Sequence, residues 1–318
     1  MKKYLITGFA GFVGRHFLEY LDDLGIQALI LGIDRQPAGF DINAFRHLKC
    51  AFTKADLLKP NEWAAAIDEF RPDYILHLAS FSSVAFSWAN PIDSFSNNTN
   101  VFLNLLEKVR ATKLKCRILS VGSSEEYGDC SAKQLPLTED TPLNPASPYA
   151  AARVSQELLS KVYVSGFGSD IVMTRSFNHI GPGQLDSFVV SSFARQLIAI
   201  KNGSAAPTIV TGDTSIVRDF VDVRDVVRAY DDLMKHGKAG EVYNICGGTG
   251  VSLSHVIKRM CAILDISVTQ VIDPQRVRIN DNKSIVGSYK KIHDEIGWQP
   301  KISLDESLKD ILRYWHDA

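Results

Sequence analysis

The feature that most restricts the fold of this chain is the alternation of short apolar runs with amphipathic stretches in its first half. Apolar runs of strand length occur at Tyr4–Thr7, Ala28–Ile33, Tyr74–Leu78, Arg117–Val121 and Ile171–Arg175. Stretches with a helical period lie between them, at Phe12–Leu24, Asn61–Phe70, Pro91–Ala111 and from near Pro148. This alternation is typical of β-α-β units, in which helices cover both faces of a parallel sheet. We therefore predict an α/β protein with a doubly wound parallel sheet.

The alternation weakens after Arg175, where glycine and proline separate shorter elements. A further helix at Phe220–His236 and a buried strand at Val242–Ile245 indicate that the chain then returns to the first sheet. We therefore assign residues 1–175 and about 213–246 to a first domain. Residues 176–212 and 247–318 are assigned to a smaller, mixed α/β domain that we expect to bind the substrate. We see no repeat or long linker, so we expect the two domains to pack as one unit.

Charge, hydropathy and cysteine spacing exclude several classes of function. The 318 residues carry a formal net charge of -1, which provides no broad basic surface for nucleic acid. No apolar run approaches the ~18 residues of a membrane span, so we also expect no membrane partner. The five cysteines are widely separated and form no pattern of metal ligands. We therefore expect no metal site and a reducing, cytosolic location.

A glycine-rich turn follows the first predicted strand and leads into the first helix. The first glycine of such a turn permits the bend, the second lets the backbone approach a pyrophosphate, and the third lets helix and strand pack closely. The amino terminus of the helix then faces the anion. A plain strand-to-helix turn is the alternative for a glycine triplet alone. We expect the whole turn to bind a dinucleotide, through Gly8, Phe9, Ala10, Gly11, Phe12, Val13 and Gly14.

An acidic residue at the end of the second strand strengthens this interpretation. Asp34 lies 20 residues after Gly14, where a carboxylate accepts hydrogen bonds from the adenosine ribose. The first domain is therefore predicted to be a Rossmann-type NAD(P)-binding domain. Asp34 repels a 2′-phosphate and favours NAD(H), while the adjacent Arg35 partly offsets this repulsion and makes NADP(H) possible. Asp56 and Leu57 end the expected third strand beside the adenine, or Asp56 caps the following helix instead.

Polar residues for catalysis occur after a later strand and at the start of a later helix. Ser123 lies in the segment Gly122–Gly128, at the end of a buried strand, where open α/β sheets bind their ligands. Tyr149 and Arg153 are four residues apart at the start of the helix near Pro148, so both side chains share one face. We expect these three side chains to meet in one crevice.

These motifs resemble the extended short-chain dehydrogenase/reductase family, in its sugar-nucleotide branch, over essentially the whole chain. The resemblance implies an enzyme whose serine or threonine, tyrosine and lysine form the active site, which maps onto Ser123, Tyr149 and, in place of lysine, Arg153. In the family the lysine binds the nicotinamide ribose and lowers the pKa of the tyrosine. Arginine keeps the positive charge but is bulkier and does not deprotonate, so a proton relay through it is lost. We expect a working but slower site.

The arginine leaves other interpretations open. One alternative is that Arg153 is an exposed arginine on the helix whose partner is solvent. A separate alternative is that arginine in place of lysine has left a catalytically weak protein that binds a sugar nucleotide or the cofactor without turnover.

The same resemblance places further residues beside the two ligands. For the cofactor it implies Leu78, Ala79, Ser80, Asn98, Tyr149, Arg153 and His179. For the sugar nucleotide it implies Ser82, Ser123, Ser124, Glu125, Asn178, Val189, Arg218 and Arg278. The asparagine at position 98 is expected to steady the backbone near the active site. The two arginines suit a diphosphate because a guanidinium group binds two phosphate oxygens at once.

The segments Gly122–Gly128 and Phe177–Gln184 most resemble the GDP-6-deoxy-D-mannose reductase and GDP-mannose 4,6-dehydratase branch. This resemblance implies reduction of the 4-keto group of a GDP-4-keto-6-deoxymannose to a GDP-rhamnose product. Tyr149 would donate the proton, and Ser123 would hydrogen-bond to the ketone. Glu125 keeps the dehydratase alternative open, because a 4,6-dehydratase needs a carboxylate to remove the C5 proton. Epimerase chemistry ranks behind both.

The family resemblance also implies a homodimer formed through a four-helix bundle. The two helices of each subunit would be Pro91–Ala111 and Pro148–Gly166. Both carry wide apolar faces: Phe95, Phe102, Leu105, Leu106 and Val109 on the first, and Val154, Leu158, Leu159, Val162 and Tyr163 on the second. The alternative is that these faces only cover the sheet.

Overall fold

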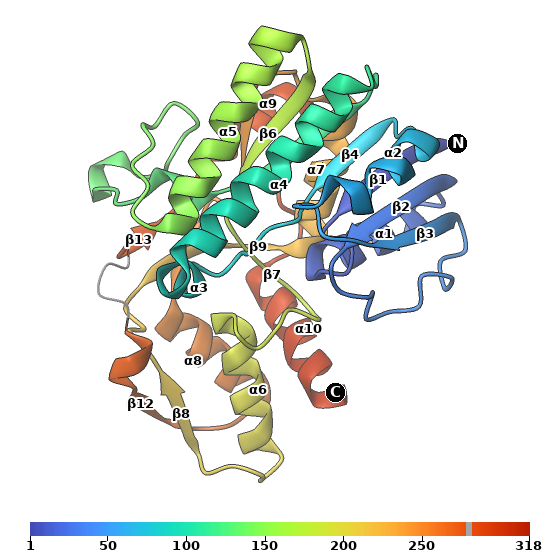
Figure 1. Ribbon diagram of the computed structural model, residues 1–318. Coiled ribbons are helices and arrows are strands. Elements are labelled where there is room, and N and C mark those ends of the chain that lie inside the picture. The colour runs from blue at the N-terminus through green and yellow to red at the C-terminus, as the bar shows by residue number, and fades with distance from the viewer. Residues whose placement is uncertain (278–281) are drawn as a thin grey trace.

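The main sheet of the protein is parallel and has seven strands. The computed structural model describes residues 1–277 and 282–318, so Arg278, one of the predicted substrate residues, lies outside the described residues. The strand order is β10-β6-β5-β4-β1-β2-β3, and every neighbouring pair is parallel. Strands β6, β4, β1, β2 and β3 of this sheet are labelled in Figure 1. The strands are β1 Lys2–Thr7, β2 Ala28–Asp34, β3 Leu48–Lys54, β4 Tyr74–His77, β5 Arg117–Ser123, β6 Asp170–Ser176 and β10 Val242–Ile245. The predicted doubly wound, Rossmann-type sheet is confirmed.

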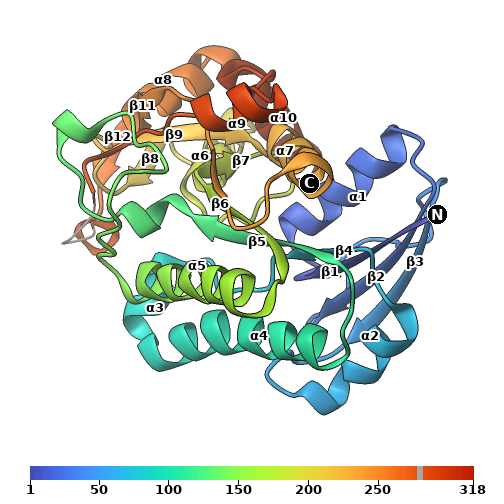
Figure 2. The same cartoon turned by 90° about the horizontal axis from the view of Figure 1, so that it is seen from above.

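Helices cover both faces of this sheet, as Figure 2 shows. One face carries α1 (Phe12–Asp23), α7 (Val223–His236) and α9 (Lys290–Ile296), and the other carries α2 (Ala64–Phe70), α4 (Pro91–Ala111) and α5 (Pro148–Phe167). The short α3 (Val84–Ala89) packs beside α4 and α5. Alternate residues of β1 face opposite layers: Tyr4 and Ile6 are in the core with α1 and α7, and Leu5 is in the core with α4. Both sets are mainly hydrophobic because both faces are buried.

The largest differences from the predicted elements concern three of them. Strand β3 ends at Lys54, before Asp56. The helix predicted at Asn61–Phe70 is a short turn of 3-10 helix, η1 (Pro60–Glu62), followed by α2. The helix predicted from Phe220 begins only at Val223, because Val217–Asp222 forms strand β9. The Asp222 carboxylate caps α7 by accepting a hydrogen bond from the Arg224 backbone N–H at 2.9 Å.

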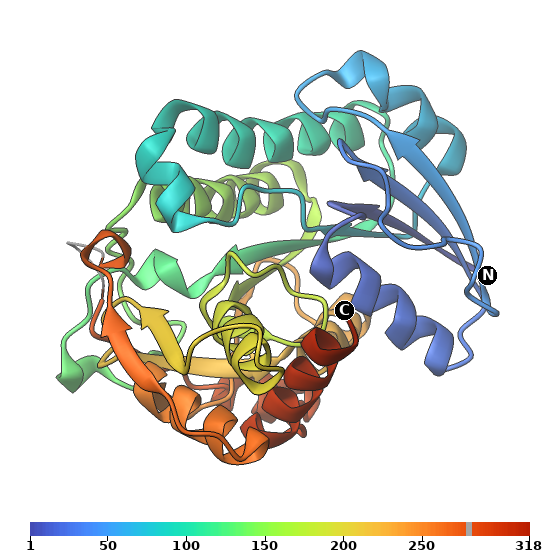
Figure 3. The same cartoon turned by 90° about the horizontal axis from the view of Figure 1, so that it is seen from below.

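A smaller part of the molecule packs around α6 (Val189–Lys201), α8 (Leu253–Leu264) and α10 (Leu304–Asp317). In Figure 3 these helices, coloured yellow, orange and red, lie across the molecule from the cyan-green α4. Strands β8 (Thr208–Thr211) and β12 (Thr269–Ile272) form a parallel pair. Strand β9 pairs with β7 (Asn178–Ile180), β11 (Gly250–Ser252) and β13 (Ser284–Ile285). Three further turns of 3-10 helix are η2 (Ser124–Tyr127), η3 (Ala132–Gln134) and η4 (Pro274–Arg276).

The chain passes between the main sheet and the smaller part more than once. Strand β9, inside the stretch 213–246, belongs to the smaller sheet. Conversely, Ile292 and Trp298, near the carboxyl terminus, are buried in the same core as Tyr4 and Phe17 of the main sheet layer. Within the described ranges, no helix has the length and apolar character needed to cross a bilayer.

Candidate active site

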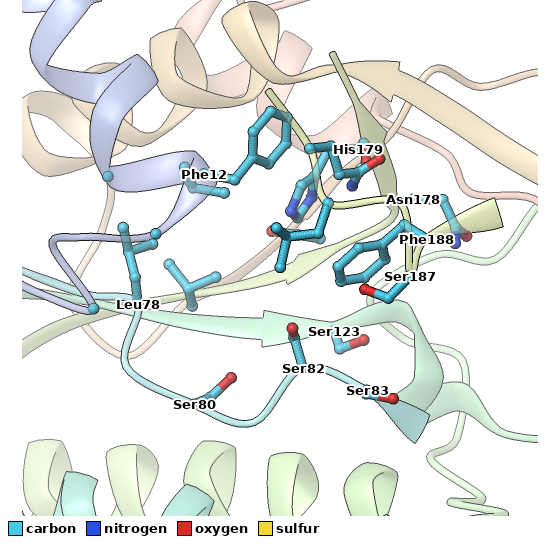
Figure 4. Close-up of a pocket in the computed structure, with 18 of the residues that line it drawn as sticks. Phe12, Leu78, Ser80, Ser82, Ser83, Ser123, Asn178, His179, Ser187 and Phe188 are labelled. Carbon is cyan, nitrogen blue, oxygen red and sulfur yellow. The ribbon is translucent and has the colours of Figure 1, made fainter. Parts of the chain in front are cut away.

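A cavity of about 1170 Å³ lies between the carboxyl ends of the main-sheet strands and the smaller part. Figure 4 shows Ser80, Ser82 and Ser123 on one wall, opposite Asn178 and His179. Most of the predicted site residues line this cavity: Gly8, Ala10, Gly11, Phe12, Val13, Gly14, Asp34, Arg35, Asp56, Leu57, Leu78, Ala79, Ser80, Ser82, Ser123, Ser124, Glu125, Tyr149, Arg153, Asn178, His179, Val189 and Arg218. Two predicted residues of the described chain, Phe9 and Asn98, do not line it.

The glycine turn forms a cradle in which side chains have no room. Gly8 has a φ of +72°, and a Cβ there would lie 2.8 Å from the Ala79 nitrogen. A Cβ at Gly14 would lie 2.5 Å from the Phe9 carbonyl oxygen. The helix α1 that starts after Gly11 has no side-chain cap, so its first N–H groups are left for an external anion. These features fit the pyrophosphate of a dinucleotide.

Phe9 turns away from the cavity. Its side chain is fully buried, and its ring centroid lies 5.6 Å from that of Phe40 and 5.7 Å from that of Phe52. A Cβ at Gly32 would lie 2.3 Å from the Phe9 ring, so the glycine in β2 makes room for it. The phenylalanine side chain thus anchors the turn in the core, and only its backbone belongs to the cradle.

Asp34 connects the glycine turn with the end of β2. One carboxylate oxygen accepts a hydrogen bond from the Ala10 backbone N–H at 3.0 Å, and the other accepts one from the Gln36 N–H, also at 3.0 Å. Each oxygen can accept a second bond, so the carboxylate can also bind a ribose. The neighbouring Arg35 guanidinium lies 4.7 Å from the centre of the Phe81 ring. An anionic and a cationic group therefore both line the cavity at this end.

Asn98 acts on the backbone beneath the cavity. Its buried amide accepts a hydrogen bond from the Phe81 N–H at 2.7 Å and donates one to the Phe81 carbonyl oxygen at 3.0 Å. It thereby fixes the loop that carries Ser80 and Ser82. In the loop after β3, the Asp56 carboxylate accepts a hydrogen bond from the Leu58 N–H at 3.0 Å and so stabilises the turn there.

Ser123 and Tyr149 are held by two well-capped segments. The Ser123 Oγ accepts a hydrogen bond from the Glu125 N–H at 3.2 Å, at the start of η2. Helix α5 starts after Ser147, whose Oγ accepts from the Ala150 N–H at 3.1 Å. Pro148 occupies the first turn of this helix, where its missing N–H costs nothing. Tyr149 follows directly and is therefore at the cavity end of the helix.

Arg153 is buried, with an exposed fraction of 5%. Its Nε donates to the Tyr149 hydroxyl at 3.3 Å, and one Nη donates to the Val121 carbonyl oxygen at 3.1 Å and to the Gln156 Oε1 at 2.7 Å. The other Nη donates to the Ser80 hydroxyl. The alternative of an exposed arginine with a solvent partner is therefore wrong. The geometry instead ties the arginine to the tyrosine and to the cavity wall.

A buried acidic residue lies directly behind Ser123. Glu126 is fully buried, and its Oε1 accepts a hydrogen bond from the Ser123 N–H at 2.7 Å. Burial, together with the nearby charge of Glu157, raises the pKa of Glu126 to about 8. Glu157 itself forms a bidentate pair with Arg175, with both contacts at 2.9 Å. Glu126 is therefore protonated near neutral pH.

The opposite wall carries the residues of β7 and β9. The His179 ring stacks near Phe12, with a centroid distance of 6.4 Å. Burial lowers the pKa of His179 to about 4, so the imidazole is neutral near pH 7. Arg218 is 6% exposed and donates to the Asn282 carbonyl oxygen at 2.7 Å. A neutral histidine therefore faces Ser123 across the cavity in Figure 4, and the Arg218 cation also lines the cavity.

Several residues of this opposite wall carry no local motif and were not predicted. Ser187 and Phe188 face the cavity in Figure 4, and Arg195 and Arg276 also line it. Arg195 pairs with Asp186 at 3.0 Å, and the carbonyl oxygen of Arg276 would lie 2.5 Å from a Cβ at Gly212. These residues meet only through the tertiary fold, so no spacing in the sequence indicates them.

A family model described as GDP-mannose 4,6 dehydratase matches residues 5–311. The chain belongs to this family. The predicted short-chain dehydrogenase/reductase type is thereby confirmed, and the family's members among the relatives are sugar-nucleotide reductases, dehydratases and epimerases.

Individual relatives and solved structures match over nearly their whole length. A GDP-6-deoxy-D-mannose reductase of Pseudomonas aeruginosa is 33% identical, covering 99% of this chain and 97% of the relative. A dTDP-glucose 4,6-dehydratase of Haemophilus influenzae is 27% identical, covering 99% and 98%. Among solved structures, RMD from Pseudomonas aeruginosa complexed with NADPH superposes with a TM-score of 0.86, at 32% identity, covering 100% of this chain and 99% of that one. A UDP-glucose 4-epimerase of Thermotoga maritima gives 0.89 at 29% identity, covering 99% of both chains.

Proposed function

We propose that the protein is an NAD(P)H-dependent reductase of a nucleotide-diphosphate 4-keto-6-deoxy sugar, of the type that converts GDP-4-keto-6-deoxymannose to GDP-rhamnose. The observation that carries this proposal is the convergence of Ser123, Tyr149 and Arg153 on the cavity that the glycine cradle also lines. The full-length similarity of 33% to a GDP-6-deoxy-D-mannose reductase supports the choice of reaction.

The residues that line the cavity would have the following roles in the reaction. A bound reduced nicotinamide supplies a hydride to the carbonyl carbon. The Tyr149 hydroxyl gives its proton to the carbonyl oxygen, so the ketone becomes an alcohol, and the Ser123 hydroxyl hydrogen-bonds to that oxygen. Arg153 holds the tyrosine through its Nε, but a guanidinium does not deprotonate, so the tyrosine recovers its proton from solvent. Arg218, which also lines the cavity, would bind the diphosphate.

The cofactor preference follows from the two groups at the adenosine end. Asp34 keeps acceptor capacity for a ribose, which favours NAD(H). Arg35 supplies a positive charge beside it, which also permits NADP(H). The NADPH in the Pseudomonas aeruginosa structure shows that a relative accepts the phosphorylated cofactor.

Assay of the purified protein tests the reaction directly. With GDP-4-keto-6-deoxymannose and NADH or NADPH, we expect the absorbance of the reduced nicotinamide to fall and a GDP-deoxyhexose to form. Tyr149→Phe should lower kcat by about 10²–10⁴-fold while cofactor binding persists. Binding of both ligands by the wild type without turnover would contradict the proposal and favour a binding protein.

A GDP-mannose 4,6-dehydratase is the second candidate, and the position of Glu125 favours it. Glu125 lines the cavity beside Ser123, where a carboxylate is suited to removing the C5 proton. Incubation with GDP-mannose separates the candidates, because a dehydratase forms a keto sugar with no net consumption of cofactor. Glu125→Gln should abolish that reaction and should affect the reductase much less. Formation of an epimeric sugar nucleotide would indicate an epimerase instead.

We also infer a homodimer in the cytosol. On α4 and α5, Phe102 and Leu105 cover the sheet, whereas Ile92, Leu158 and Val162 are 79%, 54% and 55% exposed. These exposed side chains suit a four-helix bundle with a second copy. The five cysteines are unpaired thiols, which fits a reducing compartment. Sedimentation that shows only a monomer at micromolar concentration would contradict the dimer.

A further inference from the structure

Gln156 lies one turn after Arg153 on α5, on the buried side of the helix that faces β5. Its exposed fraction is 1%. Its Oε1 accepts a hydrogen bond from Arg153 at 2.7 Å, and its Nε2 donates to the Ser120 hydroxyl at 2.9 Å and to the Val121 carbonyl oxygen at 3.1 Å. The side chain is therefore fully engaged at both ends.

The chemistry of these neighbours fixes the orientation of the amide. The Val121 carbonyl oxygen can only accept a hydrogen bond, so the amide nitrogen of Gln156 must face it. The amide oxygen then necessarily faces the guanidinium group of Arg153, which can only donate. A carboxylate would face the carbonyl oxygen with like partial charge, and an apolar side chain would leave a guanidinium N–H without this acceptor. Position 156 therefore suits a side-chain amide when residue 153 is an arginine.

The hydrogen bonds of Arg153 leave one donor for a ligand. A guanidinium group has five N–H donors, and four of them are bound by Tyr149, Val121, Gln156 and Ser80. Within the described residues, the remaining N–H is on the same nitrogen that bonds to Ser80. Ser80 and Arg153 both line the cavity, so this nitrogen is bonded to another residue of the cavity lining. The direction of that last donor depends on where the planar guanidinium is held.

We propose that Gln156 is a positioning residue that allows an arginine to work at position 153. It fixes the plane of the guanidinium so that Nε meets Tyr149 and the last N–H is available to the nicotinamide ribose. A lysine has a single ammonium nitrogen and no planar group whose orientation must be fixed. A lysine at position 153 would therefore not need Gln156. This inference rests on the proposed function, because it assigns the cofactor to the same cavity.

A double-mutant cycle tests this coupling through cofactor affinity, without need of the sugar substrate. Gln156→Met keeps the length of the side chain and removes its hydrogen bonds. We expect this change to weaken the binding of NADH and NADPH, titrated by calorimetry, by about tenfold in the Arg153 background, since a buried hydrogen bond to a charged group is lost. In the Arg153→Lys background the same change should alter the Kd by less than about twofold.

A matched control comes from the next turn of the same helix. Ser160 is buried, and its hydroxyl lies 2.9 Å from the Gln156 backbone carbonyl oxygen and 3.3 Å from the Ser120 hydroxyl, without contacting Arg153 or the Gln156 side-chain amide. Ser160→Ala should leave the Kd of the cofactor unchanged. If Gln156→Met does not fold, Gln156→Asn withdraws the amide oxygen from Arg153 and carries the same expectations.

The outcomes separate this inference from the proposed function. Equal weakening by Gln156→Met in both backgrounds, or weakening by Ser160→Ala as well, would overturn the positioning role. If Gln156→Met weakens cofactor binding only in the Arg153 background, and the wild type does not turn over the keto sugar, the positioning role is retained and the reductase is rejected. Where turnover occurs, Gln156→Met should raise the KM for the cofactor more than it lowers kcat, which a general loss of stability would not do.

Discussion

The protein buries two arginines close to helix α5, and they differ in the charge of their hydrogen-bond partners. Arg175 is 3% exposed, stacks over Tyr127 and forms a bidentate pair with the Glu157 carboxylate. Arg153 is 5% exposed and lies over Tyr149, but its hydrogen-bond partners in the described ranges are all neutral. The charge of Arg175 is thus compensated inside the fold, whereas that of Arg153 remains for the ligand and the reaction. A buried cation without a carboxylate partner is costly, which points to a functional role.

The largest expected effect concerns the compensated arginine. Glu157→Gln should lower the free energy of unfolding by about 3–5 kcal/mol, because it leaves the buried Arg175 charge without its partner. Denaturation with urea measures this loss. Asp305→Asn, which breaks the half-exposed pair with Arg259, is the control and should leave the midpoint close to that of the wild type. A small effect of Glu157→Gln would remove the contrast between the two arginines.

The second effect depends on pH and arises in the same cluster. Glu126, facing Glu157 and Arg175, has a pKa raised from 4.5 to about 8. Between these values the folded state keeps a proton that the unfolded state releases, so stability is full below pH 4.5 and falls as the pH rises to about 8. Glu126→Gln should remove this decline, which amounts to at most about 1.4 kcal/mol per pH unit. Melting curves of both proteins from pH 5 to 8 should therefore diverge; parallel curves would contradict the raised pKa.

The third prediction replaces the uncompensated arginine itself. Arg153→Lys should give an equal or higher kcat, because lysine restores a group that can relay a proton. It should also lower the free energy of unfolding by about 1–3 kcal/mol, since the Gln156 Oε1 loses its donor in a buried site. Kinetics and urea denaturation of the same preparation measure both effects. A large loss of kcat would show that the arginine has a specific catalytic role.

The smallest effect is expected at a third arginine, on the surface. Arg35 is exposed and lies over Phe81 at the adenosine end of the cavity. Arg35→Ala should raise the KM for NADPH by several-fold and leave the KM for NADH nearly unchanged, because only the former carries a 2′-phosphate. Equal changes for both cofactors would show that Arg35 acts on the shape of the loop rather than on the phosphate.

The cofactor side of the cavity is the part that the sequence predicts well. The spacing of Gly8, Gly11 and Gly14 and the position of Asp34 are local patterns, and a strand followed by a helix needs little tertiary information. Tyr149 and Arg153 are likewise one turn apart on one helix. The main strands were predicted because their apolar runs are buried on both faces.

The remaining features depend on contacts between distant segments. The burial of Phe9 requires Gly32 on the next strand, and the polar network of Arg153 joins residues 80, 121 and 156. Strand β9 was mistaken for the start of a helix because its partners, β7, β11 and β13, are dispersed along the chain. Arg195 and Arg276 reach the cavity only through the packing of the smaller part. The hydrophobic periodicity of the sequence does not indicate these contacts between distant segments.

The burial of Ile292 and Trp298 in the main core has a consequence for how the chain folds during synthesis. Their neighbours there include Tyr4 and Phe17, from the first strand and the first helix. The ribosome therefore delivers the last of these core side chains long after the first, since Trp298 follows Phe17 by 281 residues. We expect the packing of this core to remain incomplete in the nascent chain until then. A fragment that ends at residue 175 should therefore lack a closed core.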